Sequence, residues 1–179
     1  MPSSKQTASL LFEALGLKKL PRMGWVIEGA PRESLADHSF GTAIAALALS
    51  RMEGLDEKEE ALLIRKALLH DIHECRIGDL SRLQRQYVQA DWKKAEQDLL
   101  QGTHLEGEIR ILGLDESEKI SVFCKDADKL DLLFQAIDYA NAGNQNMGKF
   151  IKSALEQIRS KSGKKLARLA LKRLKKKVF

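Results

Sequence analysis

The chain has 179 residues, of which 44% are apolar and 31% are charged, and its formal net charge is +5. This composition is too rich in apolar residues for a disordered chain, and the length is sufficient for one domain with its own core. No apolar run reaches the ~18 residues of a membrane span, and the N-terminus lacks the basic-then-apolar layout of a secretory signal. The two cysteines do not indicate a disulfide framework, so we expect a cytoplasmic protein with reduced thiols.

Apolar residues recur with a period near 3.6 along most of the chain, which predicts helices. A first helix covers "KQTASLLFEALGL" and ends around Gly16. Residues 18–37, which contain most of the prolines, predict an irregular crossing. A second helix follows Asp37, which can cap it, and runs to Gly54. A third covers "DEKEEALLIRKALLHDI", whose acidic start suits the positive end of the helix dipole.

Two longer helices are predicted over residues 91–112 and 115–140. The segment "AGNQNMG" separates them from "KFIKSALEQIRS" and from a last helix over residues 160–179. No segment has the alternating pattern of a strand, and there is no internal repeat. The expected fold is therefore all-α, a bundle of roughly six to eight helices.

Positive charge is concentrated at the C-terminal end of the chain. Residues 161–179 contain nine Lys and Arg and no acid, whereas the remaining residues contain 21 basic and 25 acidic side chains. The leucines of "KKLARLALKRLKKK" are spaced as on one face of a helix, so residues 160–179 predict an amphipathic helix with a basic face. Its Leu face can pack on the domain while the lysines are solvated, or its basic face can bind nucleic acid or an anionic membrane surface.

Titratable side chains gather where the third predicted helix ends, in "LLHDIHECRIGDL". Adjacent residues on a helix point about 100° apart, so His70 and Asp71 can reach one point only near a helix end. There they can offer an imidazole nitrogen and a carboxylate oxygen to a single cation. Glu74, four residues beyond His70, would project from the same face if the helix continued. His73 also lies in this string and is a second candidate nitrogen donor.

Further candidates lie at distant positions. His38 stands directly before the apolar run of the second helix, and three acids interrupt the apolar helix at "CKDADKLDLLF", namely Asp126, Asp128 and Asp131. A carboxylate against an apolar face is costly unless it is paired, hydrogen-bonded or bound to metal. The spacing alone does not choose among these three acids.

His38, the pair His70-Asp71, and Asp128 resemble the H…HD…D signature of the HD-domain metal-dependent phosphohydrolases. The segments "RMGWVIEGAPRESLADHS", "HDIHECRIGDL" and "DADKLDLLFQAIDYANAGN" are similar to the corresponding segments of the 5'-deoxynucleotidase-like branch. The resemblance, rather than the periodicity, selects Asp128 over the other two acids. It covers residues from about 18 to 145, which we take as the core of a single HD domain over residues 1–179.

The resemblance implies that His38, His70, Asp71 and Asp128 bind one divalent metal ion. This nitrogen and oxygen set suits Mn²⁺, Co²⁺, Fe²⁺, Ni²⁺ or Zn²⁺, and Mg²⁺ less well. In the family, the residue at the position of Glu74 acts as the general base, which leaves His73 outside the ligand set.

The same resemblance assigns substrate contacts. Arg22 corresponds to an arginine that contacts the phosphate, and Asp79 to an acid near the sugar hydroxyl or the attacking water. The branch has a tryptophan directly after that arginine, whereas here Met23 follows it and the tryptophan is Trp25. This departure puts selectivity for deoxyribose in doubt, and Trp25 can either stack on a base or fill the core.

The expected function is that of a metal-dependent phosphomonoester hydrolase, a 5'-nucleotidase that releases phosphate from nucleoside or deoxynucleoside 5'-monophosphates. Two alternatives stay open. The same site could act on a cyclic nucleotide, a guanosine polyphosphate or a nucleoside triphosphate. The chain could also be a non-catalytic helical protein that binds nucleic acid through its basic tail. Members of the branch suggest a homodimer.

Overall fold

The computed structural model describes residues 1–113 and 118–175, and the regular elements in these two ranges are helical. No β-strand occurs in them; an isolated bridge pairs Pro21 with Ser34. The predicted all-α class is therefore confirmed. The α-helices are α1 (Ser4–Ala14), α2 (Met23–Ile27), α3 (Leu35–Glu53), α4 (Glu57–Leu69), α5 (Glu74–Ile77), α6 (Trp92–Leu100), α7 (Gly107–Gly113), α8 (Glu118–Asn141), α9 (Gly148–Gln157) and α10 (Lys161–Leu171).

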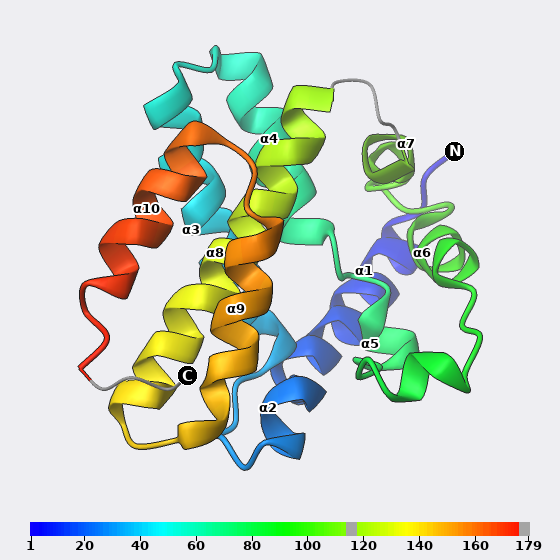
Figure 1. Cartoon of the computed structure of the whole chain (residues 1–179). Helices are drawn as coiled ribbons and strands as arrows, with labels where there is room; N and C mark the ends of the chain where they lie inside the picture. The colour runs from blue at the N-terminus through cyan, green and yellow to red at the C-terminus, as the bar shows by residue number, and fades with distance from the viewer. Residues whose placement is uncertain (114–117, 176–179) are drawn as a thin grey trace.

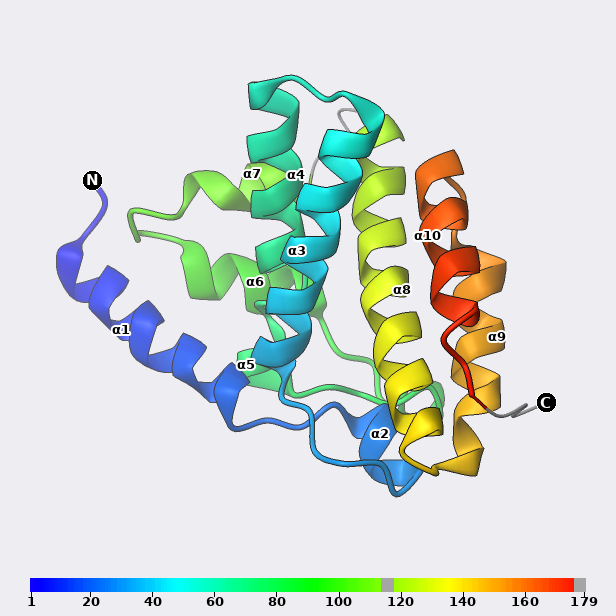
Figure 2. The ribbon, with the colours of Figure 1, turned by 90° about the vertical axis from the view of Figure 1, so that its left-hand side faces the viewer.

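The long helix α8 is the centre of the bundle (Figure 1). It packs against α3 and α4 on one side and against α9 and α10 on the other, so its inner residues form most of the main core. Figure 2 shows α1, α6 and α7 grouped beyond α4, away from α9 and α10. A second, smaller cluster of buried side chains lies between α1, η1 (Leu15–Lys18) and α6. The polar groups described below lie where α3, α4 and α8 meet.

The start of α3 differs from the sequence prediction. Its N-cap is Ser34, whose hydroxyl accepts the backbone N–H of Asp37 at 3.1 Å. Asp37 in turn accepts the backbone N–H of Ser34 at 2.9 Å, which completes a capping box. The prediction that Asp37 is itself the cap was wrong, because an acid three residues into a helix can pair reciprocally with a serine before it. As predicted, the helix ends at Gly54, which adopts the left-handed conformation.

The predicted helix over residues 91–112 is interrupted. Helices α6 and α7 are separate, because Gly102 adopts a φ of +74° and the Thr103 hydroxyl donates to the carbonyl of Leu100 at 2.6 Å. The crossing at residues 18–37 contains the short helix α2. Residues 115–117 of the next predicted helix and residues 176–179 of the tail helix lie outside the described residues.

The basic helix α10 packs on α8 and α3. Its buried face consists of Gly163, Ala167 and Ala170, and its lysines and arginines are exposed. The interpretation that the leucines pack while the cations are solvated holds in part: Leu166, Leu171 and Leu174 pack against the main core, but Leu169 is 49% exposed. The helix also ends at Leu171, earlier than predicted. Nucleic-acid binding stays a prediction. Among the described helices, none is long and apolar enough to cross a membrane.

Candidate metal centre

His38 lies at the end of the first turn of α3 and is 1% exposed. Its Nδ1 is 2.6 Å from Oδ2 of Asp131 on α8. This close approach of two helices depends on Gly41, since a Cβ at that position would lie 1.8 Å from Oδ1 of Asp131. The contact fixes the imidazole ring and directs its other nitrogen, Nε2, away from Asp131.

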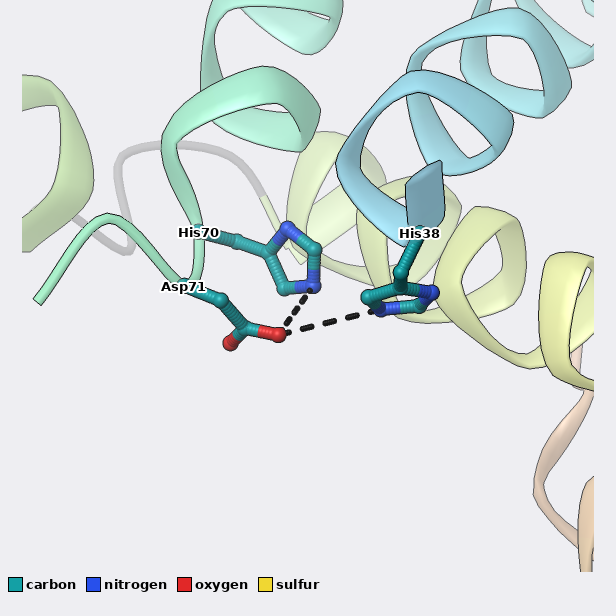
Figure 3. Close-up of side chains that lie close together, drawn as sticks. All are labelled: His38, His70 and Asp71. Atoms are coloured by element: carbon teal, nitrogen blue, oxygen red, sulfur yellow. Dashed lines mark ion pairs between the residues drawn. The ribbon is translucent and has the colours of Figure 1, made fainter. Parts of the chain in front are cut away.

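His70 and Asp71 directly follow α4, which ends at Leu69. The Nδ1 of His70 is bonded to the carbonyl of Ala67 at 2.8 Å, and its Nε2 lies 3.1 Å from Oδ2 of Asp71. Figure 3 shows one oxygen of this carboxylate joined by dashed lines to a nitrogen of each imidazole ring. Nε2 of His38 lies 3.7 Å from that oxygen. The helix does not continue to Glu74, so the two adjacent side chains converge through the turn at its end, as the sequence predicted for a helix terminus.

The three acids of α8 have three different environments. Asp126 is fully buried and accepts the backbone N–H groups of Arg159 and Ser160, each at 2.8 Å. Asp131 bonds to His38, as described above. Only Asp128 faces the free side of the imidazole: its Oδ1 lies 3.5 Å from Nε2 of His38. Lys129 contacts the other oxygen of Asp128 at 2.8 Å.

These side chains have the arrangement that a common cation requires. Atoms that bind one ion at ~2.1 Å lie ~3–4 Å from each other, and the distances of 3.1, 3.5 and 3.7 Å given above fall in this range. The Nε2 atoms of His38 and His70 are buried and accept or donate no hydrogen bond within the described residues. Buried nitrogens of this kind normally have a partner. His38, His70 and Asp71 each offer an atom within 4.8 Å of the others, so these three can hold a metal ion here. Asp128 is added to this set by its distance of 3.5 Å from Nε2 of His38.

The electrostatics of the cluster favour a positive charge among its carboxylates. Burial acts to lower the pKa of His70, but the charges of Asp71 and Asp128 and the bonds of the ring to Asp71 and to the Ala67 carbonyl together outweigh burial and raise the pKa to about 9. Burial acts to raise the pKa of Asp71, but the charge and hydrogen bond of His70, together with the charges of His38 and Arg22, outweigh this effect, so the pKa falls well below the ordinary range. Burial, followed by the charge of Arg22, lowers the pKa of His38. A proton on His70 thus supplies the positive charge that the carboxylates attract.

Glu74 begins α5 and is 3% exposed. Burial, reinforced by the charges of Asp71 and Asp79, raises its pKa to about 8. Its Oε2 is buried without a partner in the described part of the chain, and Glu74 can reach Asp71 and His73 closely enough to share an ion with them. A buried carboxyl with a free oxygen beside the imidazoles is placed to accept a proton from a small molecule at the cluster.

Arg22 is tethered to the site by its backbone. It is the N-cap of α2, its N–H donates to the carbonyl of Glu33 at 2.9 Å, and the next N–H, of Met23, donates to Oδ2 of Asp79 at 2.7 Å. Burial lowers the pKa of the Arg22 guanidinium, but the carboxylates around it outweigh burial and raise the pKa above its ordinary value; these are Asp128, Asp71, Glu33 and Asp79. Arg22 is thus a cation held among acids at the edge of the cluster.

Asp79 is the last site residue that was predicted from this loop, and its carboxylate accepts the backbone N–H of Met23 in α2. Its other oxygen lies 4.0 Å from Nη2 of Arg85, which is also 3.9 Å from Oε1 of Glu74. Arg85 is half-exposed and stacks over Trp92 with its guanidinium 5.0 Å from the ring centre. No sequence pattern indicated this second arginine, because it belongs to an irregular segment.

Trp25 lies in the core. It is 1% exposed, its indole N–H donates to the carboxylate of Glu33, and its ring packs edge-on against Tyr139 and obliquely against Phe150. Of the two interpretations left open by the sequence, filling the core agrees with this burial. Burial also raises the pKa of Glu33 to about 7, although Arg22 acts in the opposite direction.

Two supporting residues were not assigned a role from the sequence. Asp131 orients His38, and the only signal for it is its position one turn after Asp128 on the same helix. His73 was placed outside the ligand set; its Nδ1 is buried without a partner among the described residues, and its ring packs edge-on against Trp92.

Comparison with known proteins identifies a matching family and several relatives. Residues 15–171 match the HD domain family. The chain is 29% identical to a curated 5'-deoxynucleotidase HDDC2 from Mus musculus over 72% of this chain and 67% of the relative. It is also 29% identical to the protein of the same name from Dictyostelium discoideum, over 81% and 84% of the two chains.

A solved structure has the same fold. The PH0347 protein from Pyrococcus horikoshii OT3 is 30% identical, superposes with a TM-score of 0.75, and is matched over 93% of this chain and 97% of its own. Together with the match over most of the sequence, this shows that the chain belongs to the HD domain family.

Proposed function

We propose that the chain is a metal-dependent phosphomonoester hydrolase, a 5'-nucleotidase that converts nucleoside 5'-monophosphates to nucleoside and inorganic phosphate. One observation carries the proposal: the Nε2 atoms of His38 and His70 are buried without a hydrogen bond in the described residues, and both face the carboxylate of Asp71, while Nε2 of His38 also faces Asp128. The names of the curated relatives support a nucleotide as the substrate.

We expect His38, His70, Asp71 and Asp128 to hold the ion. When bound, a divalent cation supplies positive charge beside the phosphate and makes a water molecule more acidic. The choice of Asp128 rests on the distance to His38, since Asp126 and Asp131 are already bonded elsewhere. The mixed donor set favours Mn²⁺, Co²⁺, Fe²⁺, Ni²⁺ or Zn²⁺ over Mg²⁺.

Glu74 acts as the general base in this proposal. Its free Oε2 takes one proton from the attacking water, whose oxygen forms the new bond to phosphorus while the bond from phosphorus to the 5'-oxygen breaks. A proton then returns to that oxygen, which leaves as the nucleoside hydroxyl. A pKa raised to about 8 by burial makes Glu74 a stronger base than an exposed glutamate.

Arg22 contacts the phosphate in this proposal. Its guanidinium lies among acids and makes no direct ion pair within the described residues, so its donors are available to phosphate oxygens. Asp79 holds α2 and hence Arg22 in place through Met23, and we assign it a contact to the sugar or the water as well. With Trp25 in the core, we assign no stacking on the base to this side chain.

The decisive experiment removes metal from the purified protein and adds back one ion at a time. Phosphate release is then measured on all ribo- and deoxyribonucleoside 5'-monophosphates, with a cyclic nucleotide, a guanosine polyphosphate and a nucleoside triphosphate in the same panel. The proposal predicts turnover of monophosphates with Mn²⁺ or Co²⁺ and none without metal. Turnover of another substrate class alone, or of none, would contradict it.

A further inference from the structure

Arg85 belongs to the segment between α5 and α6, which Figure 1 shows at the edge of the molecule. Two reciprocal hydrogen bonds fix this segment: the N–H of Ser81 donates to Oε1 of Gln84 at 2.9 Å, and the N–H of Gln84 donates to Oγ of Ser81 at 3.3 Å. Arg85 directly follows, and its own N–H donates to the carbonyl of Ser81 at 3.0 Å. The backbone therefore holds Arg85 in a defined place outside the regular α-helices.

The guanidinium group of Arg85 is fixed as well. Its Nε donates to the carbonyl of Leu80 at 2.7 Å, and the group lies over the ring of Trp92, 5.0 Å from the ring centre. Trp92 in turn packs edge-on against His73, with 5.3 Å between the ring centres. An aromatic face orients a guanidinium, because both groups are planar and the ring attracts the cation. The side chain of Arg85 is nevertheless 53% exposed, so Trp92 covers one side of it and leaves the rest open.

Arg85 lies on the outer side of the acids at the site. Its Nη2 is 3.9 Å from Oε1 of Glu74 and 4.0 Å from Oδ1 of Asp79, and both distances are longer than a hydrogen bond. Among the described residues, neither Asp71 nor Asp128 forms an ion pair with Arg85. In the sequence of contacts that starts at the proposed metal ligands, Arg85 therefore comes after Glu74 and Asp79.

A nucleoside 5'-monophosphate has its parts in the same order. Its phosphate would lie at the metal ligands with Arg22, its sugar near Asp79, and its base, which is farthest from the phosphate, near Arg85. We propose that Arg85, supported by Trp92, is the platform on which the base of the substrate stacks. Trp25 cannot take this role because it is buried in the core. The inference rests on the proposed function and names the residue that distinguishes nucleotides from other phosphomonoesters.

The chemistry of stacking sets the kind of selectivity. Every base has a π-face, and bases stack on guanidinium planes as they do on aromatic rings. The platform should therefore favour phosphomonoesters that contain a base over those that contain only a sugar, with little preference among the bases.

A different role for Arg85 would act through Glu74, whose carboxylate is opposite its charge. The two roles differ in the substrates that they affect. A change at Glu74 alters the cleavage of every phosphomonoester, because the attack of water on phosphorus is the same in all of them. Loss of the platform affects only substrates that have a base.

The first test compares two substrates that differ only in the base. These are adenosine 5'-monophosphate and methyl β-ribofuranoside 5-phosphate, which has a methoxy group in place of the base. With Mn²⁺ present, the parent should prefer the nucleotide by roughly 5–30-fold in kcat/KM, mainly through KM, as expected for one stacked base. Arg85→Ala should lose this preference, and so should Arg85→Lys, which keeps the charge without the plane.

The matched control is Arg82→Ala, at an exposed arginine of the same segment, which should keep the parent preference. Circular dichroism establishes that each variant is folded. The ratio between the two substrates cancels any change in the attack on phosphorus, so it isolates the base. An unchanged preference in Arg85→Ala, or a preference restored by Arg85→Lys, would overturn the proposal.

The second test measures binding without turnover. In the phosphonate analogues of the two substrates, a methylene group replaces the 5'-oxygen, so the bond to phosphorus cannot be hydrolysed. Calorimetry with Mn²⁺ should show that Arg85→Ala weakens binding of the adenosine phosphonate by roughly 5–30-fold and leaves the sugar phosphonate unchanged. Turnover in the parent without this base-dependent effect would overturn the inference alone. A base-dependent effect on binding without turnover in the parent would support the platform and overturn the proposed function.

Discussion

Asp126 and Asp128 lie two residues apart on α8, and the buried polar atoms around them differ in one respect. Asp126 is 0% exposed, and both of its oxygens accept backbone N–H groups where α9 leads into α10. The group around Asp128 instead contains buried atoms without partners in the described part of the protein, on His38, His70 and Glu74.

The difference separates a structural acid from a functional one. Burying a polar atom without a hydrogen bond costs free energy, so a chain under selection for stability alone pairs such atoms, as it does around Asp126. Several buried atoms that converge on one point without hydrogen bonds are instead kept when a bound ligand supplies the missing partners. Variants of the two groups should therefore separate activity from stability.

The largest effect is expected for Asp128→Ala. Loss of a metal ligand should lower metal affinity by more than the ~10–100-fold that follows loss of a supporting contact, and phosphate release should fall at least as far. Bound metal and turnover are measured on the same preparation. Asp138→Ala, an exposed acid on the same helix, is the control and should retain both. Normal metal content in Asp128→Ala would contradict the assignment.

Glu74→Gln should lower kcat by ~10²–10⁴-fold, because the amide keeps the size of the side chain but cannot accept a proton. Metal content should stay at the parent level, which distinguishes a general base from a ligand. Glu106→Gln, at an exposed glutamate, provides the comparison and should turn over at the parent rate. If the Glu74 variant does so as well, the proposed mechanism is wrong.

Asp126→Ala should change stability rather than chemistry. It leaves the N–H groups of Arg159 and Ser160 without acceptors, at ~1–3 kcal/mol for each buried group, so we expect the free energy of unfolding to fall by ~2–4 kcal/mol. Denaturant titration measures this. The folded variant should bind metal as the parent does; loss of metal at unchanged stability would reverse the roles of the two acids.

The smallest effect concerns pH. The pKa of Glu33 is raised from 4.5 to about 7 in the folded protein, so the folded state binds more protons than the unfolded state between these values. Its contribution to stability is present below pH 4.5 and is lost as pH rises to about 7.

Glu33→Gln should remove this dependence, because the amide oxygen still accepts the indole N–H of Trp25 and does not titrate. We expect the variant to be more stable than the parent at pH 8, by up to ~3 kcal/mol, and similar to it near pH 4.5. The check is a set of thermal or denaturant melts across this range. A parent that gains stability relative to the variant as pH rises would contradict the assignment.

Local sequence patterns predicted much of this architecture. The end of α3 at Gly54 and the acidic start of α4 were predicted from local residues, and the periodicity predicted the long helix α8. The break between α6 and α7 was missed, because the apolar period continues across Gly102 and only the backbone conformation interrupts it. The cap of α3 was placed at Asp37 rather than Ser34, since both residue types occupy such positions.

For the site, helix-end geometry predicted that His70 and Asp71 could converge. The choice of Asp128 needed the resemblance to a family, because periodicity treats the three acids of α8 alike. Contacts between distant segments could not be predicted: the bond from Asp131 to His38 depends on how close Gly41 allows two helices to approach. The burial of Trp25 likewise depends on Tyr139 and Phe150, which are more than one hundred residues away.

The most direct test of the central claim is a crystal structure of the protein with Mn²⁺, with anomalous scattering used to locate the ion. We predict one strong peak bonded at ~2.0–2.3 Å to Nε2 of His38, Nε2 of His70 and one oxygen each of Asp71 and Asp128. A structure at saturating Mn²⁺ in which these four side chains bind no ion, or in which Asp128 turns away from it, would contradict the account.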